Sequence, residues 1–292
     1  MSDPPAIEGA EHQYAEIDTL DAGRLRVHYA DSGGKNDPVI LLHGWPQHFW
    51  CWRFIVPQLV DRYRVICPDL RGFGWTGTPG RGYDPETFAA DTVALMDALG
   101  LERVKLVGHD WGGFSGFILA LRHPRRVERY LALNTPVPWA PIAPRLLLES
   151  WRGWYTWTLA LAAPWALRRR RGLAHWMLRH GYVHEGITDA DAHAYAERLR
   201  EPERIRASQL LYRSYQRAFL DVGIKRAYHG MRLTTPTRLV FGTNDLYVST
   251  ALTRGWEEHA DDMTVEYVDD SGHFIPEEKP DLVVARIREL FG

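Results

Sequence analysis

The segment around Asp110 constrains the fold more than any other part of the sequence. An apolar run at residues 104–107 leads into Gly108-His109-Asp110-Trp111-Gly112-Gly113, and a helix-like stretch follows at residues 113–122. Small residues on both sides of Asp110 permit a sharp turn between a strand and a helix, which leaves one side chain exposed above a sheet. The alternative is a structural joint in which Asp110 only caps the helix. The glycines on both flanks favour the first interpretation.

This layout is that of a nucleophile elbow, with aspartate in the place where serine is usual. A serine must lose a proton before it attacks, whereas a carboxylate with a pKa near ~4 is already an anion at neutral pH. The helix dipole adds roughly 0.3–1 kcal/mol for a charge in the first turn. The segment therefore predicts that Asp110 is a carboxylate nucleophile.

The composition is that of a folded protein without a membrane span. Of the 292 residues, 45% are hydrophobic and 25% are charged, and no apolar stretch approaches the roughly 20 residues of a span. Residues 1–16 lack a secretory pattern, so we expect a cytoplasmic protein. The net charge of −2 gives no electrostatic reason to bind nucleic acid. Cys51 and Cys67 lack metal-ligand spacing, and Cys67 lies in an apolar run, as a buried residue would.

Charge divides the chain into two differently built parts. Residues 138–230 contain 15 Lys/Arg and 8 Asp/Glu, a net charge of +7, which leaves −9 for the remainder. The densest cationic stretch is the run of four arginines at residues 168–171. Such a run is typical of a solvated helix end or loop, with a membrane or an anionic partner as the alternative.

Short β-rich runs alternate with helical patterns through most of the chain. Residues 16–20 and 25–29 alternate polar and apolar side chains around Asp21-Ala22-Gly23, which predicts a hairpin. Further strands are predicted at residues 38–42, 65–67, 104–107, 130–133, 238–241 and 265–268, and helices up to residue 60, at residues 85–99 and after each of the last two strands. We therefore expect an α/β fold with a mostly parallel eight-stranded sheet flanked by helices.

One long interval, residues 134–236, lacks β-rich runs. Helix-like stretches within it lie at residues 151–161, 173–180, 189–199 and 204–220. We expect a helical cap at residues 138–229, inserted after the sixth strand, and a core domain made of residues 1–137 and 230–292. Such an insert would lie over the carboxyl ends of the strands, where ligands of doubly wound sheets bind.

Two late loops supply partners for Asp110. Asp245 follows one strand in Gly242-Thr243-Asn244-Asp245, and His273 follows the last strand in Ser271-Gly272-His273-Phe274. Parallel strands end at the same edge of a sheet, so these three side chains can converge. Their order along the chain, nucleophile, acid and histidine, is typical of a catalytic triad on such a sheet.

The chain resembles the epoxide hydrolases of the α/β-hydrolase fold along nearly its whole length. The motifs that carry this resemblance are His43-Gly44-Trp45-Pro46, Asp69-Leu70-Arg71-Gly72-Phe73-Gly74, the segment around Asp110, Asn134-Thr135-Pro136, Asp245 and Gly272-His273-Phe274. The resemblance implies that Asp110 attacks a carbon atom and forms an alkyl–enzyme ester. His273 would then deprotonate the water that hydrolyses this ester, and Asp245 would orient His273.

The resemblance also implies an oxyanion hole formed by the backbone N–H groups of Trp45 and Trp111. Pro46 fits the tight loop that this requires, with a cis bond as one way to make it. Arg71 is expected to be structural, paired with a carboxylate beneath the site. The residues expected to line the substrate pocket are His43, Pro46, Trp111 and Trp154.

Opening an epoxide leaves a basic alkoxide, so an acid is required, and tyrosine with a pKa near ~10 can supply the proton. The family places two cap tyrosines there. Tyr155 and Tyr212 match these positions, although Leu211 replaces the usual aromatic residue before Tyr212. Tyr215 lies three residues on, on nearly the same helix face, and is the alternative to Tyr212.

A haloalkane dehalogenase with the same triad is the main alternative. In that reaction the leaving group is a halide, which N–H donors stabilise. Trp111 and a second tryptophan from the insert could supply these donors. Trp45 counts mildly against it, since many dehalogenases have asparagine there. A hydrolase-fold protein that only binds a ligand is a further alternative, but every group required for catalysis is present.

The expected substrate is a small apolar epoxide, because the insert is rich in aromatic residues that could line an apolar pocket. The tryptophans concerned are Trp139, Trp151, Trp154, Trp157, Trp165 and Trp176. This chemistry calls for no metal or organic cofactor. The sequence leaves the oligomeric state open, and a homodimer is allowed.

Overall fold

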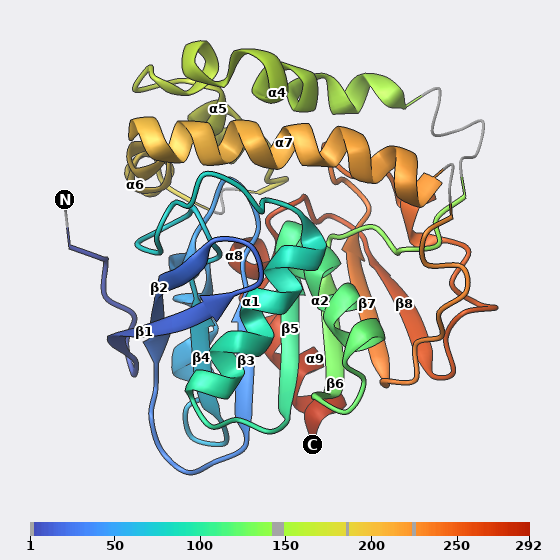
Figure 1. Ribbon diagram of the computed structural model, residues 1–292. Helices are drawn as coiled ribbons and strands as arrows, with labels where there is room; N and C mark the ends of the chain where they lie inside the picture. The colour runs from blue at the N-terminus through green and yellow to red at the C-terminus, as the bar shows by residue number, and fades with distance from the viewer. Residues whose placement is uncertain (1–2, 142–148, 185–186, 224–225) are drawn as a thin grey trace.

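A central sheet of eight strands organises the protein in the computed structural model, which describes residues 3–141, 149–184, 187–223 and 226–292 (Figure 1). The strands are β1 (Glu11–Thr19), β2 (Gly23–Asp31), β3 (Pro38–Leu42), β4 (Arg64–Pro68), β5 (Val104–His109), β6 (Val127–Leu133), β7 (Thr237–Gly242) and β8 (Met263–Val268). They are arranged in the order β1-β2-β4-β3-β5-β6-β7-β8. The predicted fold class and strand number are confirmed.

The sheet is antiparallel at one edge and parallel elsewhere. β1 pairs with β2, and β2 with β4, in antiparallel register, whereas the pairs from β4 to β8 are parallel. The β1–β2 hairpin turns at Gly23, which adopts a φ of +73° that favours glycine. The predicted hairpin is thus confirmed.

Two hydrophobic cores lie on opposite faces of the sheet. In β3, Ile40 and Leu42 pack into one core, and Val39 and Leu41 into the other, as the two-residue period of a strand requires. Helices α1 (Pro85–Ala98) and α2 (Asp110–Arg122) cover the first face, and α9 (Pro280–Phe291), which follows the short α8 (Ile275–Glu278), covers the second (Figure 1). Burial on both faces explains why the central strands are continuously apolar.

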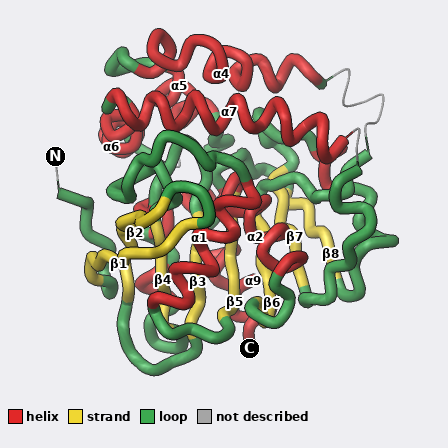
Figure 2. The backbone as a smooth tube through the Cα atoms, viewed as in Figure 1, coloured by secondary structure: helices red, strands yellow, loops and turns green. Residues whose placement is uncertain are grey.

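Between β6 and β7, the described residues include four helices, which form a layer above the sheet (Figure 2). They are α4 (Trp154–Leu167), α5 (Leu173–His180), α6 (Asp189–Leu199) and α7 (Pro202–Gly223), with a single 3-10 turn, η3 (Ser150–Gly153), before them. The Thr188 side chain caps α6 through a capping box with Asp191, which sets where that helix begins. All four helices fall within the predicted cap at residues 138–229, whose outer bounds stay a prediction.

The prediction of a helix is wrong at two places. The segment up to Val60 contains only the 3-10 turns η1 (Phe49–Trp52) and η2 (Val56–Gln58), and η4 (Thr250–Thr253) is the helical turn between β7 and β8. In the first case Pro57 lacks a backbone donor, and the Phe49 N–H donates to the Asp69 carboxylate at 2.9 Å. These contacts tie the segment to a neighbouring loop rather than to a regular helix.

Candidate active site

Asp110 lies at the sharp turn between β5 and α2, with a φ of +51° that side chains other than glycine rarely adopt. A Cβ at Gly112 would lie 2.4 Å from the Leu42 carbonyl oxygen, and a Cβ at Gly44 would lie 2.4 Å from the Asp110 Cβ. The Thr135 hydroxyl donates to the Asp110 carbonyl at 2.9 Å. The turn is thus closely packed, and glycine is required where the chain passes next to Asp110.

Backbone N–H groups approach the Asp110 carboxylate from two turns. The Trp45 N–H donates to Oδ2 at 2.9 Å, and the Trp111 N–H also binds the carboxylate. The Trp45–Pro46 bond is cis. These are the two donors that the sequence predicts for an oxyanion hole.

The structure brings Asp110, Asp245 and His273 together at the carboxyl edge of the sheet. The Nδ1 atom of His273 lies 2.7 Å from Oδ2 of Asp245, and Nε2 lies 3.9 Å from Oδ1 of Asp110. With the Nδ1 proton donated to Asp245, the lone pair of Nε2 is directed to the space beside Asp110. The histidine can therefore accept a proton from a water at that place.

Asn134 completes the surroundings of Asp245. Its amide donates to Oδ2 of Asp245 at 2.8 Å and to the Gly272 carbonyl at 3.1 Å, and its φ is +42°. The N–H groups of Tyr247 and Val248 donate to Oδ1 of Asp245 at 2.7 and 2.9 Å. Sequence reasoning singled out Asn134 only as part of a motif, and its place at the end of β6 was the available signal for this role.

The pKa values of the three groups shift in different directions. Burial raises the pKa of Asp110 to about 6, although His273 and the N–H groups of Trp45 and Trp111 oppose this shift. Burial also acts to raise the pKa of Asp245, but His273 and Asn134 outweigh it and hold that pKa below its ordinary value. Burial lowers the pKa of His273, and the carboxylates of Asp245 and Asp110 more than reverse this, so the net shift is upward.

Three cap tyrosines lie around Asp110. Tyr212, on α7, contacts the rings of Trp45 and Trp111 edge-on, with centroids at 5.2 and 6.0 Å. Tyr155, on α4, lies with its ring centroid 5.7 Å from that of Tyr212, and Tyr215 lies 5.8 Å from Trp111. Burial raises the pKa of all three phenols, and the negative charge of Asp110 adds to the shift.

The expected pocket residues fall into two groups. Pro46 and Trp111 are buried beside Asp110. His43 is 0% exposed: Leu70 N–H donates to its Nε2 at 3.0 Å, and its Nδ1 donates to the Gly44 carbonyl at 2.9 Å, so both nitrogens serve the loop beneath the site. Trp154 is 47% exposed and packs against Trp176. The structure therefore does not place His43 or Trp154 at a pocket wall.

The tryptophans of the insert also lie elsewhere than expected. Trp139 is buried, and its indole N–H donates to the Tyr228 carbonyl at 2.8 Å. The other five are 41–67% exposed: Trp151, Trp154, Trp157, Trp165 and Trp176. The expectation that they line an apolar pocket is wrong, because a helix that is apolar all round does not reveal from its sequence which face is turned inward.

Several structural expectations are confirmed. The Arg71 guanidinium forms a bidentate pair with Asp91, with both distances at 2.7 Å, and a further contact with Asp21 at 2.8 Å. The arginines at residues 168–171 are exposed just beyond the end of α4, which agrees with a solvated helix end and equally with a surface for an anionic partner. Cys51 and Cys67 are both buried and free.

A buried carboxylate that sequence reasoning missed joins the insert to the core. Glu277, on α8, accepts hydrogen bonds from the hydroxyls of Tyr182 and Tyr195 at 2.7 and 2.9 Å, and it pairs with Arg53. On the other side of the site, the Trp45 indole donates to the Ser208 hydroxyl at 3.0 Å. These bonds hold the insert over Asp110 from two sides.

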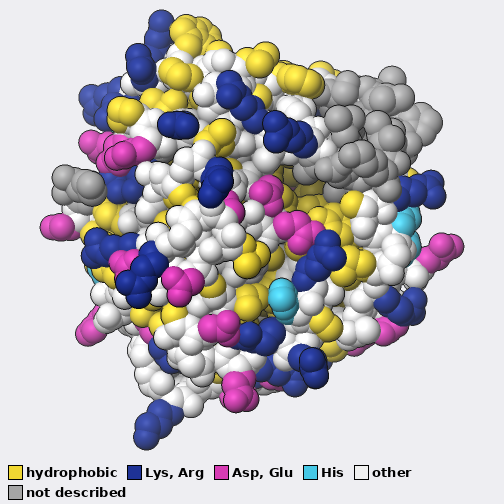
Figure 3. All heavy atoms as spheres, in the orientation of Figure 1, with side chains coloured by type: hydrophobic (Ala, Val, Ile, Leu, Met, Phe, Trp, Pro, Cys, Tyr) yellow, Lys and Arg dark blue, Asp and Glu magenta, His cyan; other side chains and the backbone are white. Residues whose placement is uncertain are grey.

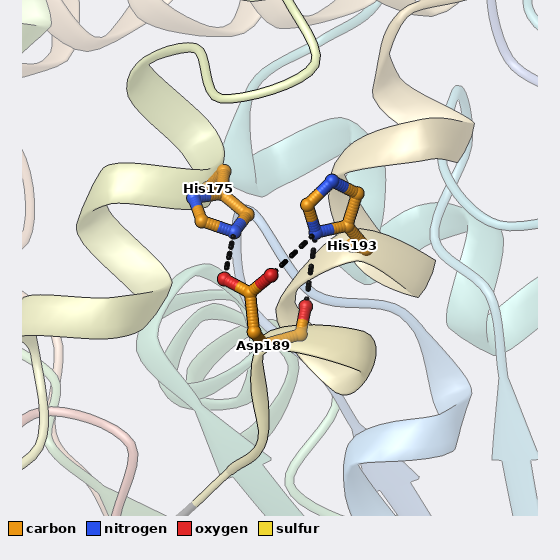
Figure 4. A group of neighbouring side chains, drawn as sticks. All are labelled: His175, Asp189 and His193. Atoms are coloured by element: carbon orange, nitrogen blue, oxygen red, sulfur yellow. Dashed lines mark hydrogen bonds and ion pairs between the residues drawn. The ribbon is translucent and has the colours of Figure 1, made fainter.

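One group of side chains in the described part of the chain has the types and spacing of metal ligands: His175, Asp189 and His193 (Figure 4). The carboxylate of Asp189 lies 2.9 Å from His175 and 3.4 Å from His193. However, Arg170 donates to the Nε2 atom of His193 at 2.8 Å, and Arg171 lies 3.5 Å from Asp189. Two guanidinium groups would repel a cation there, so we interpret the group as an ionic contact between α5 and α6.

Comparison with known proteins places the chain in a family. Residues 37–280 match the model of the α/β hydrolase fold family. The chain is 31% identical to the soluble epoxide hydrolase of Corynebacterium sp. (strain C12), over 91% of this chain and 94% of that protein. It is 29% identical to haloalkane dehalogenase 2 of Mycobacterium tuberculosis, over 94% of each.

A solved structure agrees with the sequence comparison. The structure of the epoxide hydrolase CorEH without ligand matches 96% of this chain and 99% of its own, with a TM-score of 0.76 and 28% identity. In the described part of our chain, no helix is both long and apolar enough to cross a membrane. The chain belongs to the α/β-hydrolase fold family, in which it is an epoxide hydrolase-like hydrolase.

Proposed function

We propose that the protein is an epoxide hydrolase that converts a small apolar epoxide and water into a vicinal diol through an ester on Asp110. The observation that carries this proposal is the position of two cap tyrosines: Tyr212 packs on Trp111, next to the carboxylate in the elbow, and Tyr155 packs on Tyr212. A carboxylate attacks a strained ring, and phenols protonate the oxygen that leaves it. Pro46 and Trp111 form the adjoining walls of the substrate site.

In the first step, Oδ1 of Asp110 attacks one ring carbon and the bond between that carbon and the epoxide oxygen breaks. Oδ2 is held by the Trp45 N–H, which leaves Oδ1 on the side of His273. The epoxide oxygen takes a proton from a cap tyrosine and becomes a hydroxyl group. The substrate is then bound to Asp110 as a hydroxyalkyl ester.

In the second step, Nε2 of His273 takes a proton from water, and the hydroxide attacks the ester carbon of Asp110. The charge on the ester oxygen develops where the N–H groups of Trp45 and Trp111 lie. When the ester bond breaks, the imidazolium returns its proton to the departing alkoxide, which gives the second hydroxyl of the diol. Hydrolysis leaves Asp110 as a carboxylic acid. Its proton passes to the phenolate of the tyrosine, which returns both groups to their starting states.

The dehalogenase alternative lacks its second N–H donor in the described residues. Trp111 lies next to the nucleophile, but the Trp45 indole is bound to Ser208 and the Trp139 indole to a carbonyl. The remaining tryptophans of the insert are exposed at its surface. Tyrosines rather than indoles therefore surround the place where the leaving group departs.

The decisive experiment uses the His273→Gln variant, mixed with styrene oxide and 1-bromohexane together. Without its base, the variant should form the ester and fail to hydrolyse it, so intact mass should rise by the whole mass of the epoxide. The added mass should disappear when Asp110 is also replaced. A hexyl adduct would show a dehalogenase instead, and the absence of any adduct would contradict the proposed electrophile.

The tyrosines are tested by Tyr155→Phe and Tyr212→Phe, alone and combined. Because general acids contribute roughly 10²–10⁴-fold, the double variant should lose about that factor in the rate of epoxide opening, and more than either single variant. Tyr267→Phe, a half-exposed tyrosine on β8, is the control and should retain full activity. If the double variant still opens epoxides at near the wild-type rate and Tyr215→Phe does not, Tyr215 is the acid.

A further inference from the structure

The outer face of α4 is apolar, although α4 forms the outermost layer of the insert (Figure 1). Its exposed apolar residues recur at spacings of three and four, as in a stripe along a helix, and α4 is kinked at Ala162 within this stretch. The stripe consists of Trp154, Trp157, Leu161 and Trp165, which are 47%, 57%, 71% and 67% exposed. The opposite face, which includes Leu159 and Ala163, is buried. The helix is thus apolar on both sides but packed on only one.

Two neighbouring tryptophans extend this stripe. Trp151 precedes α4, and Trp176 on α5 lies with its ring 6.1 Å from that of Trp154. We call the set the α4 patch: Trp151, Trp154, Trp157, Leu161, Trp165 and Trp176. In the described part of the chain, every tryptophan that is more than 40% exposed belongs to it. Exposed apolar side chains gathered in one place, as opposed to scattered singly, mark sites of interaction with proteins or membranes.

Residues 150–184, which contain the whole α4 patch, carry only positive charge, and two carboxylates flank them: Glu149 lies 3.8 Å from Arg152, and Asp189 lies 3.5 Å from Arg171. The stretch contains six arginines and no aspartate or glutamate. Arg168, Arg169, Arg170 and Arg171 are exposed at the end of α4, and the Arg169 guanidinium lies 5.9 Å from the centre of the Trp165 ring. Figure 3 shows hydrophobic side chains along the top of the molecule, with Lys and Arg side chains beside them.

Tryptophan and arginine together are typical of surfaces that rest in the interface of a lipid bilayer. The indole ring lies at the level of the headgroups, and arginines are attracted to anionic lipids. A second copy of the chain would instead bring two cationic faces together, and this stretch offers no carboxylate to pair them. We propose that the α4 patch docks the protein on the surface of an anionic phospholipid bilayer, with α4 lying flat on it.

This inference does not depend on the catalytic proposal, because none of the α4 patch belongs to the triad or the tyrosines around Asp110.

The test is co-sedimentation of the full chain with phosphatidylcholine vesicles that contain either 30% or no phosphatidylglycerol. We expect binding to the anionic vesicles, a blue shift of tryptophan fluorescence and release at high salt. Two variants remove the apolar contribution and the electrostatic contribution to binding separately. Trp157→Glu with Leu161→Glu places charge in the stripe, and a second variant changes all four arginines at residues 168–171 to glutamine.

The matched controls change surfaces elsewhere. Leu20→Glu alters a leucine that is 88% exposed in the β1–β2 turn. A second control changes four exposed arginines outside the insert to glutamine, with the same change in net charge: Arg24, Arg62, Arg103 and Arg125. We expect each patch variant to lose at least tenfold in vesicle affinity and both controls to keep it.

Three results would overturn the inference: no binding to anionic vesicles, equal loss in the controls, or a stable dimer in sedimentation velocity that Trp157→Glu with Leu161→Glu dissociates. The last would assign the α4 patch to a second copy of the chain. Circular dichroism and the melting temperature of each variant ensure that a loss of binding is not a loss of folding.

Discussion

Asp110 and Asp245 are two carboxylates at the same edge of the sheet, both next to His273, yet their pKa values shift in opposite directions. Burial alone does not explain this difference. The Asp245 side chain is 1% exposed and has the lower pKa, whereas that of Asp110 is 16% exposed and has the higher one. The charge of His273 lowers the pKa of both carboxylates. Asp245 accepts more hydrogen bonds than Asp110, and a carboxylate that accepts several is stabilised as an anion even without water.

The two surroundings suit two different tasks. Both oxygens of Asp245 are occupied, by His273 and Asn134 on one side and by two backbone N–H groups on the other. Asp110 has a contact of 3.9 Å to His273 on its Oδ1 side, too long for a hydrogen bond. We infer that Asp245 is fixed as a permanent anion that orients His273, while Asp110 keeps an oxygen available for attack.

The largest expected effect follows from removing the nucleophile. Asp110→Asn should lower turnover by at least about 10⁵-fold, because no ester can form, while the protein stays folded. The measurement is steady-state diol formation, with intact mass to exclude deamidation back to aspartate. Activity within tenfold of the wild type would refute the assignment of Asp110.

Asp245→Asn should act on the other half of the reaction. His273 would lose the partner that fixes its tautomer, so ester hydrolysis should slow by roughly 10²–10⁴-fold while ester formation continues. Rapid-quench mass spectrometry should therefore detect the ester in this variant but not in Asp110→Asn. If both variants failed at the same step, the division of roles between the two carboxylates would be wrong.

A smaller effect is expected at Asn134. Asn134→Ala removes one donor from Asp245 and leaves buried polar groups without a partner, which should cost about 1–3 kcal/mol in the free energy of unfolding. Ester hydrolysis should slow by about tenfold, since His273 keeps its main partner. Asn244→Ala changes an exposed asparagine near Asp245 and is the control. Equal effects of the two substitutions on melting temperature and rate would contradict the role of Asn134.

The smallest effect is a shift along the pH axis. With a pKa of about 6, Asp110 should lose its nucleophilic anion as the pH falls below that value, so the rate of ester formation should drop there. His273 lowers the pKa of Asp110. In His273→Gln, the fall in the rate of ester formation at acidic pH should therefore begin at higher pH. Single-turnover ester formation measured from pH 4.5 to pH 8 tests both statements. If this fall stayed at the same pH in the variant, or moved to lower pH, His273 would not lower the pKa of Asp110.

Much of the fold and part of the site could be predicted because they depend on periodicity and strand order. Two alternating segments and six β-rich runs identified all eight strands, and α5 and α6 have the bounds that their patterns predict. Parallel strands bring their ends to one edge, so Asp110, Asp245 and His273 meet although they lie far apart in the chain. The segment up to Val60 was harder to predict, since its conformation depends on a hydrogen bond to distant Asp69.

By itself, the sequence determined the sheet, the turn at Asp110 and the residue types at the ends of β5, β7 and β8, because each follows from local pattern and from steric limits on glycine. Only the tertiary structure decided which side chains of the insert turn inward. Tyr155 and Tyr212 lie close enough to Asp110 for its charge to act on their phenols, whereas the tryptophans of α4 face outward. The reason is physical: a helix that is apolar all round buries the face that fits its neighbours, and that fit depends on residues far away in the sequence.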